Sequence, residues 1–193
     1  MVGLMLFGCA PQFAPLVSPT AIPTSDTDGP ALATQEPVDP PRSEESALKA
    51  ANKTVQADQD AFFGSYTGTV SIESDAEFET GEYLALKEEF TAGADGGTMS
   101  GEPNRWVPNL ARSSASGLLV DGTEYEFGEA TLLGCFQSRS TLVYDSDPSP
   151  APTSTGAYFP TEVVLDYEPA RRIWLISKMT SLSDFGATEC NIP

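Results

Sequence analysis

From residue 64 onward, apolar and polar side chains alternate along short segments that glycine- and proline-containing turns separate, and this pattern most constrains the fold. A period of two places successive side chains on opposite faces of a β-strand, so it predicts half-buried strands. We expect strands within 64–72, 84–90, 118–127, 131–136, 138–145, 160–168 and 172–180. Clean alternation is typical of antiparallel strands with one solvated face. The sequence therefore predicts an all-β domain, an antiparallel barrel or sandwich of about eight to nine strands.

Turn residues separate these segments. Asp121-Gly122 lies between two alternating runs, which is a strong hairpin signal because a tight hairpin turn needs residues that tolerate positive φ. Turns are also expected at 168–171 and at 95–97. The proline- and serine-rich stretch 146–155 cannot continue a sheet. It is predicted to be an exposed loop, and a partner-binding segment, an O-glycosylated patch and a simple inserted loop all remain open.

The first 60 residues have a different composition. Half of the 16 prolines lie between Pro11 and Pro41, in a stretch rich in Ser, Thr and Ala that lacks a sustained apolar pattern. Such a stretch buries too little surface to offset its ordering entropy, which predicts a disordered tether over 9–42. Residues 43–60 then predict a short helix with Ser43 as its N-cap and a thin apolar stripe. The expected β-rich domain covers 61–193.

The amino terminus carries a short apolar run that ends at Cys9. Leu6-Phe7-Gly8-Cys9 resembles the bacterial lipobox, although Phe7 is bulkier than usual at its position and no basic region precedes the run. This resemblance implies that residues 1–8 are the remnant of a signal peptide. It also implies that Cys9 is acylated, which would anchor the chain in a membrane of the cell envelope, facing the periplasm or the exterior. The run is far shorter than the ~20 residues that span a bilayer.

Cys135 and Cys190 remain once Cys9 is assigned to the anchor. In an exported protein, two remaining thiols most simply form a disulfide, here between a predicted strand and the carboxyl-terminal tail. A redox thiol or a metal pair is the alternative. However, there is no CxxC spacing and no nearby basic cluster, so we predict a structural bridge.

Charge and composition exclude several function classes. The net charge of −18 would repel a nucleic-acid backbone, so we expect no nucleic-acid partner. The chain has no histidine, which removes the commonest catalytic base and the commonest metal ligand. Lys87 and Lys178 are the only lysines past residue 60, and alternation places both on outward faces, away from a serine partner. We therefore expect no enzyme activity, no metal site and no cofactor.

The expected function is binding. Phe63-Gly64-Ser65-Tyr66 at the start of the first predicted strand resembles the opening motif of the lipocalins, with Tyr66 in place of the usual tryptophan. Such a resemblance implies a barrel that holds a small apolar ligand. Tyr66, Trp106 and Trp174 are the side chains expected nearest to a small apolar or amphipathic ligand, because each offers a large apolar area with a polar tip. The alternative is a structural or protein-interaction lipoprotein with a filled core, which would bind another envelope protein.

Overall fold

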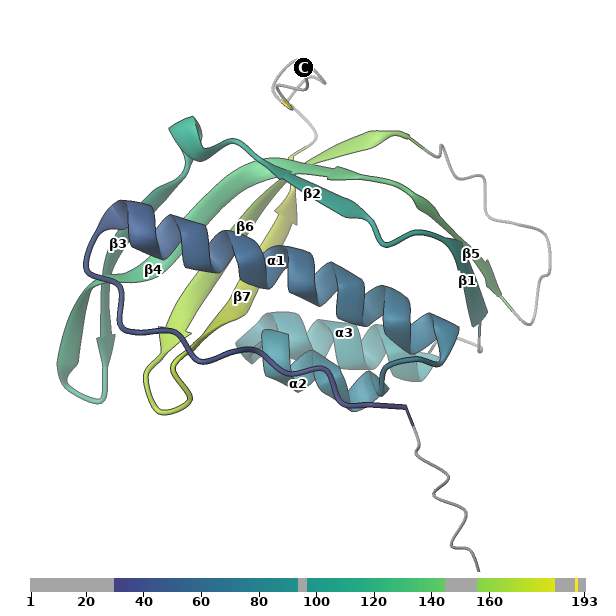
Figure 1. Cartoon of the computed structure of the whole chain (residues 1–193), viewed down its shortest axis with the longest axis horizontal. Coiled ribbons are helices and arrows are strands. Elements are labelled where there is room, and N and C mark those ends of the chain that lie inside the picture. Colours follow the sequence, from purple (N-terminus) through teal and green to yellow (C-terminus); the bar gives the residue numbers. More distant parts are fainter. Residues whose placement is uncertain (1–29, 94–96, 145–155, 183–189, 191–193) are drawn as a thin grey trace, which may run out of the picture.

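In the described part of the chain, helices come first and strands follow (Figure 1). The computed structural model describes residues 30–93, 97–144 and 156–182 together with Cys190. Within these residues, three α-helices precede seven strands, and every pairing between these strands is antiparallel. The helices are α1 (Glu44–Thr67), α2 (Asp75–Phe78) and α3 (Gly81–Gly93). The strands are β1 (Gly97–Gly101), β2 (Arg105–Pro108), β3 (Ser114–Val120), β4 (Thr123–Gln137), β5 (Ser140–Tyr144), β6 (Tyr158–Glu168) and β7 (Ile173–Ser181).

The long strand β4 organises the larger sheet. Along one side it pairs first with β3 and then with β2, and on its other side it pairs with β6, which pairs with β7. β1 and β5 form a separate two-stranded sheet. The helix α1 lies across the larger sheet, and α3 packs against β7 (Figure 1). The fold is therefore β-rich with one helical layer; no closed barrel forms among the described strands, and a sandwich describes the arrangement only loosely.

The helix α1 begins where the sequence predicts. Ser43 is the N-cap, its side chain accepts a hydrogen bond from the Ser46 backbone N–H, and the Ser46 hydroxyl lies within 3.1 Å of the Ser43 backbone nitrogen. This reciprocal capping satisfies N–H groups that have no partner inside the helix. The predicted apolar stripe is buried, and small residues within it let the helix approach the sheet closely. The stripe and the sheet residues that close the core with it are Ala47, Leu48, Ala51, Val55, Leu132, Val163, Leu165 and Ile176.

Two predicted strands are wrong. Residues 64–67 continue α1, so Tyr66 lies in a helix, and residues 84–90 lie within α3. In α3, Tyr83 and Lys87 are four residues apart and both border the space between α3 and α1, which is a helical spacing. Leu86, expected to be an inward strand residue, is 64% exposed. Helix packing overrides the local alternation here, and seven described strands replace the eight to nine expected.

The turns and the disulfide agree with the sequence. Asp121-Gly122 joins β3 to β4, with φ of 49° and 80°, the two positive values that a tight hairpin turn requires. The turn expected at 168–171 joins β6 to β7. Cys135 of β4 and Cys190 form a disulfide with their Cα atoms 5.5 Å apart. Closing a loop across 55 positions contributes about 4 kcal/mol on the chain-entropy estimate, so the bridge matters for a domain of this size.

Part of the predicted tether is folded. Residues 31–38, which we call the strap, run along the domain and form hydrogen bonds with residues of α1, α2, β6 and β7. Ser71 N–H donates to Ala31 O at 2.9 Å, and Val38 N–H donates to Arg172 O at 2.7 Å. The Tyr167 hydroxyl also donates to Val38 O at 3.1 Å. The prediction of a disordered segment is therefore wrong for residues 31–38 of the range 9–42.

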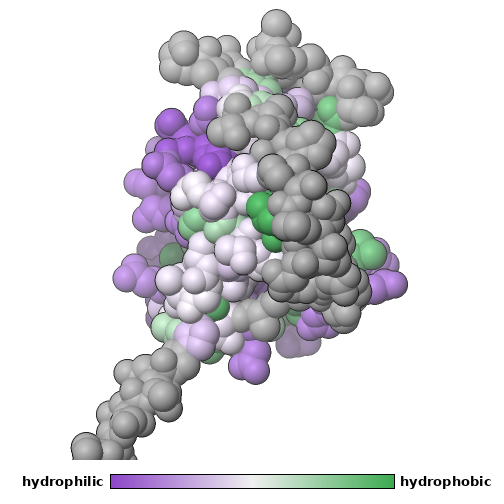
Figure 2. Space-filling view, turned by 90° about the vertical axis from the view of Figure 1, so that its right-hand side faces the viewer, coloured by the Kyte–Doolittle hydropathy of each residue, from purple (hydrophilic) through white to green (hydrophobic). Residues whose placement is uncertain are grey.

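Several predicted features lie outside the described residues: Cys9 and its lipobox, residues 95 and 96 of the turn at 95–97, and the loop 146–155. Among the described residues, none of the helices combines the length and the apolar composition that crossing a membrane requires. On the face that Figure 2 shows, hydrophobic residues of the described chain reach the surface only in small separate areas. Most of that face is hydrophilic or of intermediate hydropathy.

Candidate functional site

A hollow of about 420 Å³ lies between the strap and α1, and we call it the strap groove. One wall is a stripe of α1 whose members recur at helical spacing. The opposite wall is the strap, and Trp174 of β7 closes the hollow from the sheet side. The complete lining is Thr34, Gln35, Glu36, Val38, Ser46, Lys49, Ala50, Lys53, Thr54, Ala57 and Trp174.

The groove exists because of the side chains on that helical stripe. Ser46, Ala50 and Ala57 are small, so they leave space between the helix and the strap that leucine at the same positions would fill. Ala50 and Val38 also pack against the buried core, so the apolar lining continues into the interior. A second hollow of about 400 Å³ shares Val38, Ser46, Ala50 and Trp174 with the groove and extends it towards Arg42.

Gln35 holds the strap in place and uses its side-chain amide fully. Its Nε2 donates to Glu77 O at 2.6 Å and to Trp174 O at 2.7 Å, and its Oε1 accepts from the Thr54 hydroxyl at 2.9 Å. These contacts tie the strap to α2, β7 and α1 at once. They position the wall of the groove and leave no free polar atom on the Gln35 amide.

Trp174 is the most distinctive residue of the groove. The residue is 1% exposed, and its ring meets Tyr167 at 5.7 Å in an edge-on arrangement. Its Nε1 is buried and has no hydrogen-bond partner among the described residues. A buried donor without an acceptor costs about 1–3 kcal/mol, and this indole N–H is one of two such unsatisfied buried side-chain atoms among the described residues.

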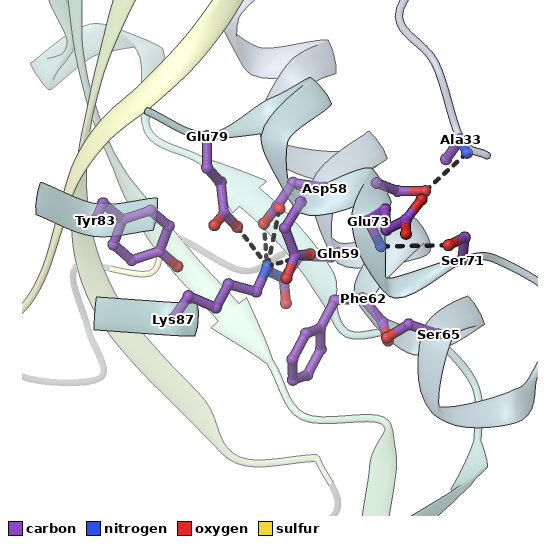
Figure 3. Close-up of polar contacts among 12 residues, drawn as sticks. Ala33, Asp58, Gln59, Phe62, Ser65, Ser71, Glu73, Glu79, Tyr83 and Lys87 are labelled. Atoms are coloured by element: carbon purple, nitrogen blue, oxygen red, sulfur yellow. Dashed lines mark hydrogen bonds and ion pairs between the residues drawn. The ribbon is translucent and has the colours of Figure 1, made fainter. Parts of the chain in front are cut away.

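The second candidate is a buried charge cluster between α1 and α3, which we call the Lys87 cluster (Figure 3). The Lys87 ammonium lies 3.4 Å from Asp58 Oδ1 and 3.1 Å from Asp75 Oδ1, and it also pairs with Glu79 Oε1. The Lys87 side chain is only 11% exposed, and those of Asp58 and Glu79 are 1% and 0% exposed. The prediction that Lys87 faces outward is therefore wrong, because α3 turns it into the interior.

The electrostatics of the Lys87 cluster follow from burial and from the number of acids. Burial, with hydrogen bonding and repulsion from Asp58, raises the pKa of Glu79 to about 9 against the opposing effect of Lys87. Burial also raises the pKa of Asp75. Burial lowers the pKa of Lys87, but the three carboxylates outweigh it and raise that pKa above its ordinary range. Lys87 thus stays an ammonium, whereas a nucleophilic lysine needs a lowered pKa.

A pKa of about 9 favours the neutral form of the Glu79 carboxyl at physiological pH. Its Oε2 is buried and has no hydrogen-bond partner among the described residues. Hydrogen bonding with Asp58 acts in the same direction as burial on the pKa of Glu79. The cluster therefore sets the Lys87 ammonium among three acids, and it joins α1 to α3.

A hollow of about 330 Å³ lies beside the Lys87 cluster. Its lining is Gln59, Phe62, Tyr83, Leu86 and Lys87. The Lys87 ammonium is 5.0 Å from the centroid of the Phe62 ring, a cation–π distance. The lysine already fills the role that a bound cation would have there, so the strap groove is the better candidate for a ligand.

The three aromatic residues expected at a ligand do not meet. Trp174 lines the strap groove, whereas Trp106 and Tyr66 are absent from its lining. Trp106 packs at 4.8 Å on Phe136, and its Nε1 donates to Asn52 Oδ1 of α1 at 2.8 Å, so it fastens helix to sheet. Tyr66 is near the end of α1 and contacts Phe62 edge-on at 5.1 Å. No group of described His, Cys, Asp or Glu side chains is arranged to hold a metal ion.

Sequence reasoning missed the strap and the Lys87 cluster. The helical recurrence of Ser46, Ala50, Ala57 and the intervening lysines was visible as small and polar residues opposite the apolar stripe of α1. The four-residue spacing of Tyr83 and Lys87 was a helical signal within a segment that alternation assigned to a strand. No local pattern marks residues 31–38 as folded, because their contacts are with residues far along the chain.

Comparison with known proteins gives little further information. No protein-family model matches the chain, and no curated protein matches its sequence. Among solved structures, the chain is similar to the intermembrane space region of the chloroplast protein ARC6, with a TM-score of 0.47 and 15% sequence identity. That match covers 74% of this chain and 98% of the other. A likeness at this level supports no statement about function.

Proposed function

We propose that this chain is an exported lipoprotein, anchored in a membrane of the cell envelope by acylated Cys9, whose domain holds a small apolar or amphipathic ligand in the strap groove. The observation that carries the binding function is the groove itself. Its volume of about 420 Å³ lies in the range of roughly 300–1,000 Å³ that is typical of small-molecule sites. Its lining combines apolar side chains with a few polar groups, as such sites usually do.

The region between α1 and the sheet is filled by packed side chains, which favours the groove over the interior as the binding site. Trp106, Leu132, Val163, Leu165 and Ile176 are buried there and pack together. A ligand inside the domain would have to displace these side chains, whereas the strap groove is already hollow. The lipocalin-like placement of a ligand inside a barrel is therefore not part of this proposal.

The anchor rests on the lipobox resemblance of Leu6-Phe7-Gly8-Cys9. Pro30 follows Cys9 by 21 positions, a length of chain that spans at most ~75 Å. The domain would therefore stay within that distance of its membrane. Cys9→Ser is expected to move the protein from the membrane fraction to the soluble exported fraction. Equal fractionation of wild type and variant would refute the anchor.

The binding function is tested by filling the groove. Ala50→Leu places a larger side chain on the helical stripe, and the matched control is Ala85→Leu at an exposed position of α3. The full chain with Cys9→Ser avoids competition from the anchor's own acyl chains. Thermal-shift screening of apolar and amphipathic compounds should find one that stabilises this protein by about 2.7 kcal/mol at a hundredfold excess over Kd.

The response of the variants decides between the two functions of the domain. The stabilising compound should lose its effect on Ala50→Leu and keep it on Ala85→Leu. If no compound stabilises the protein, or if both variants respond alike, the groove is not a ligand site. The alternative, a protein-interaction lipoprotein with a filled core, would then stand in its place.

A further inference from the structure

The neutral polar groups beside the strap groove do not define a ligand. The Gln35 amide is fully engaged within the domain. Trp174 Nε1 has no partner among the described residues, but it is buried in a residue that is 1% exposed, so it is closed to a molecule in the hollow. The charged side chains of the lining are therefore the groups that can select a ligand.

The charge of the groove is opposite to that of the whole chain. Lys49 and Lys53 both line it, and they are two of the four lysines in a chain with a net charge of −18. Glu36 is the single acidic side chain in the lining, so the groove carries an excess of one positive charge. Neither lysine forms an ion pair with any residue that the structure describes. Both ammonium groups are available to a ligand.

The remaining lining combines apolar side chains with the hydroxyl groups of Thr34, Ser46 and Thr54. Val38, Ala50, Ala57 and Trp174 offer hydrocarbon surface, and the lysine stems can extend it while their ammonium groups stay at the solvent edge. The adjoining hollow of about 400 Å³ gives an extended chain room to continue along the helix. A cationic rim and an elongated, partly apolar floor together match a molecule with one anionic head and one hydrocarbon chain.

We infer that the strap groove binds a long-chain carboxylate, with the carboxylate paired with the ammonium groups of Lys49 and Lys53. This inference rests on the proposed function and specifies its ligand class. A carboxylate is preferred over an alcohol because it forms charged hydrogen bonds with the lysines. An alkylamine is disfavoured because its head repels both lysines and offers no lone pair when protonated.

The test compares three ligands that share one chain and differ in the head: dodecanoate, dodecanol and dodecylamine. Calorimetric titration of the full chain carrying Cys9→Ser, below the concentration at which micelles form, gives the three dissociation constants. We expect dodecanoate to bind on the order of tenfold more tightly than dodecanol, with dodecylamine weakest. The preference for dodecanoate should shrink as salt is added, because the lysines are at the solvent edge.

Variants assign the preference to the groove. Lys49→Gln with Lys53→Gln should weaken dodecanoate towards the affinity of dodecanol and leave dodecanol unchanged. Lys178→Gln is the control, since Lys178 is an exposed lysine of β7 outside the groove.

The outcomes separate this inference from the proposed function. Equal binding of all three ligands that Ala50→Leu abolishes would overturn the carboxylate preference and keep the groove as a binding site. A preference for dodecylamine, or a dodecanoate preference that survives the double lysine variant, would also overturn it. If none of the three binds, the carboxylate inference fails. The wider compound screen then tests the groove function separately, and that function fails as well if no compound stabilises the protein.

Discussion

Glu79→Gln should change how the stability of this domain depends on pH. Glu79 is 1% exposed, and the Thr80 N–H bonds to Ile176 O at 2.9 Å, so the local backbone is fixed against β7. Glutamine keeps the shape of a neutral carboxyl and replaces its O–H with an N–H that can still donate to Asp58. The substitution therefore removes the titration of the group while conserving its packing.

The magnitude follows from the difference between the folded and unfolded pKa values. Burial raises the pKa of Glu79 from 4.5 to about 9, so between these values the folded state holds a proton that the unfolded state has lost. The stabilising contribution is complete below the unfolded value and is lost as the pH rises towards the folded value. One full proton corresponds to about 1.4 kcal/mol per pH unit. From pH 6 to pH 8, the wild type should lose about 3 kcal/mol through this group, and Glu79→Gln should not.

Urea denaturation followed by circular dichroism at pH 6, 7 and 8 measures this effect. The free energy of unfolding of the variant relative to wild type should rise steadily with pH. Glu82→Gln, an exposed acid of α3, is the control for the loss of one negative charge. Parallel stability curves for Glu79→Gln and wild type would show that Glu79 carries no raised pKa, and the description of the Lys87 cluster as a proton-holding group would be wrong.

Two further predictions concern the packing of the domain. Lys87→Met removes the cation shared by two buried carboxylates and one partly buried carboxylate, so it should cost about 3–5 kcal/mol of unfolding free energy. Lys178→Met at an exposed site should cost less than about 0.5 kcal/mol in the same urea assay. A cost below about 1 kcal/mol for Lys87→Met would contradict the charge cluster. Gly134→Ala would bring a Cβ within 2.6 Å of the Trp106 ring and should lower the free energy of unfolding by about 1–3 kcal/mol. Gly117→Ala is the control, because the nearest neighbour of its added Cβ is 3.6 Å away. Equal losses of stability in the two variants would refute the close contact.

The strands past residue 100 could be predicted because local and global preferences agree there. From Thr161 to Glu168, β6 alternates buried and partly exposed residues, which is the pattern predicted from the sequence. Asp121-Gly122 fixes the β3–β4 hairpin through its own backbone preference, and Ser43 fixes the start of α1 through its side chain. Each of these signals depends on a few neighbouring residues, so no knowledge of distant contacts is needed.

The helical half of the domain could not be predicted in the same way. Residues 61–67 are rich in aromatic residues and glycine, which favours a strand or a turn locally, yet they extend α1. The extension is stabilised by packing, since Ala61 and Gly64 are buried within it. The candidate site fails to show in the sequence for a related reason. Trp174 was identified as a ligand-facing aromatic, but its partners come from the strap and from α1, more than a hundred residues earlier in the chain.

The strap connects the two halves of the proposed function. It forms one wall of the groove through Thr34, Gln35, Glu36 and Val38, and it is also the segment through which the domain would connect to its membrane anchor. A ligand that contacts both the strap and α1 binds only when the strap is docked. It therefore stabilises the docked state over the undocked state by the difference between its binding free energies for the two states. By the same linkage, any force or partner that detaches residues 31–38 would weaken ligand binding by an equal free energy. In the proposed lipoprotein, attachment to the membrane and occupancy of the groove would therefore depend on one segment, which the three hydrogen bonds of Gln35 hold against the domain.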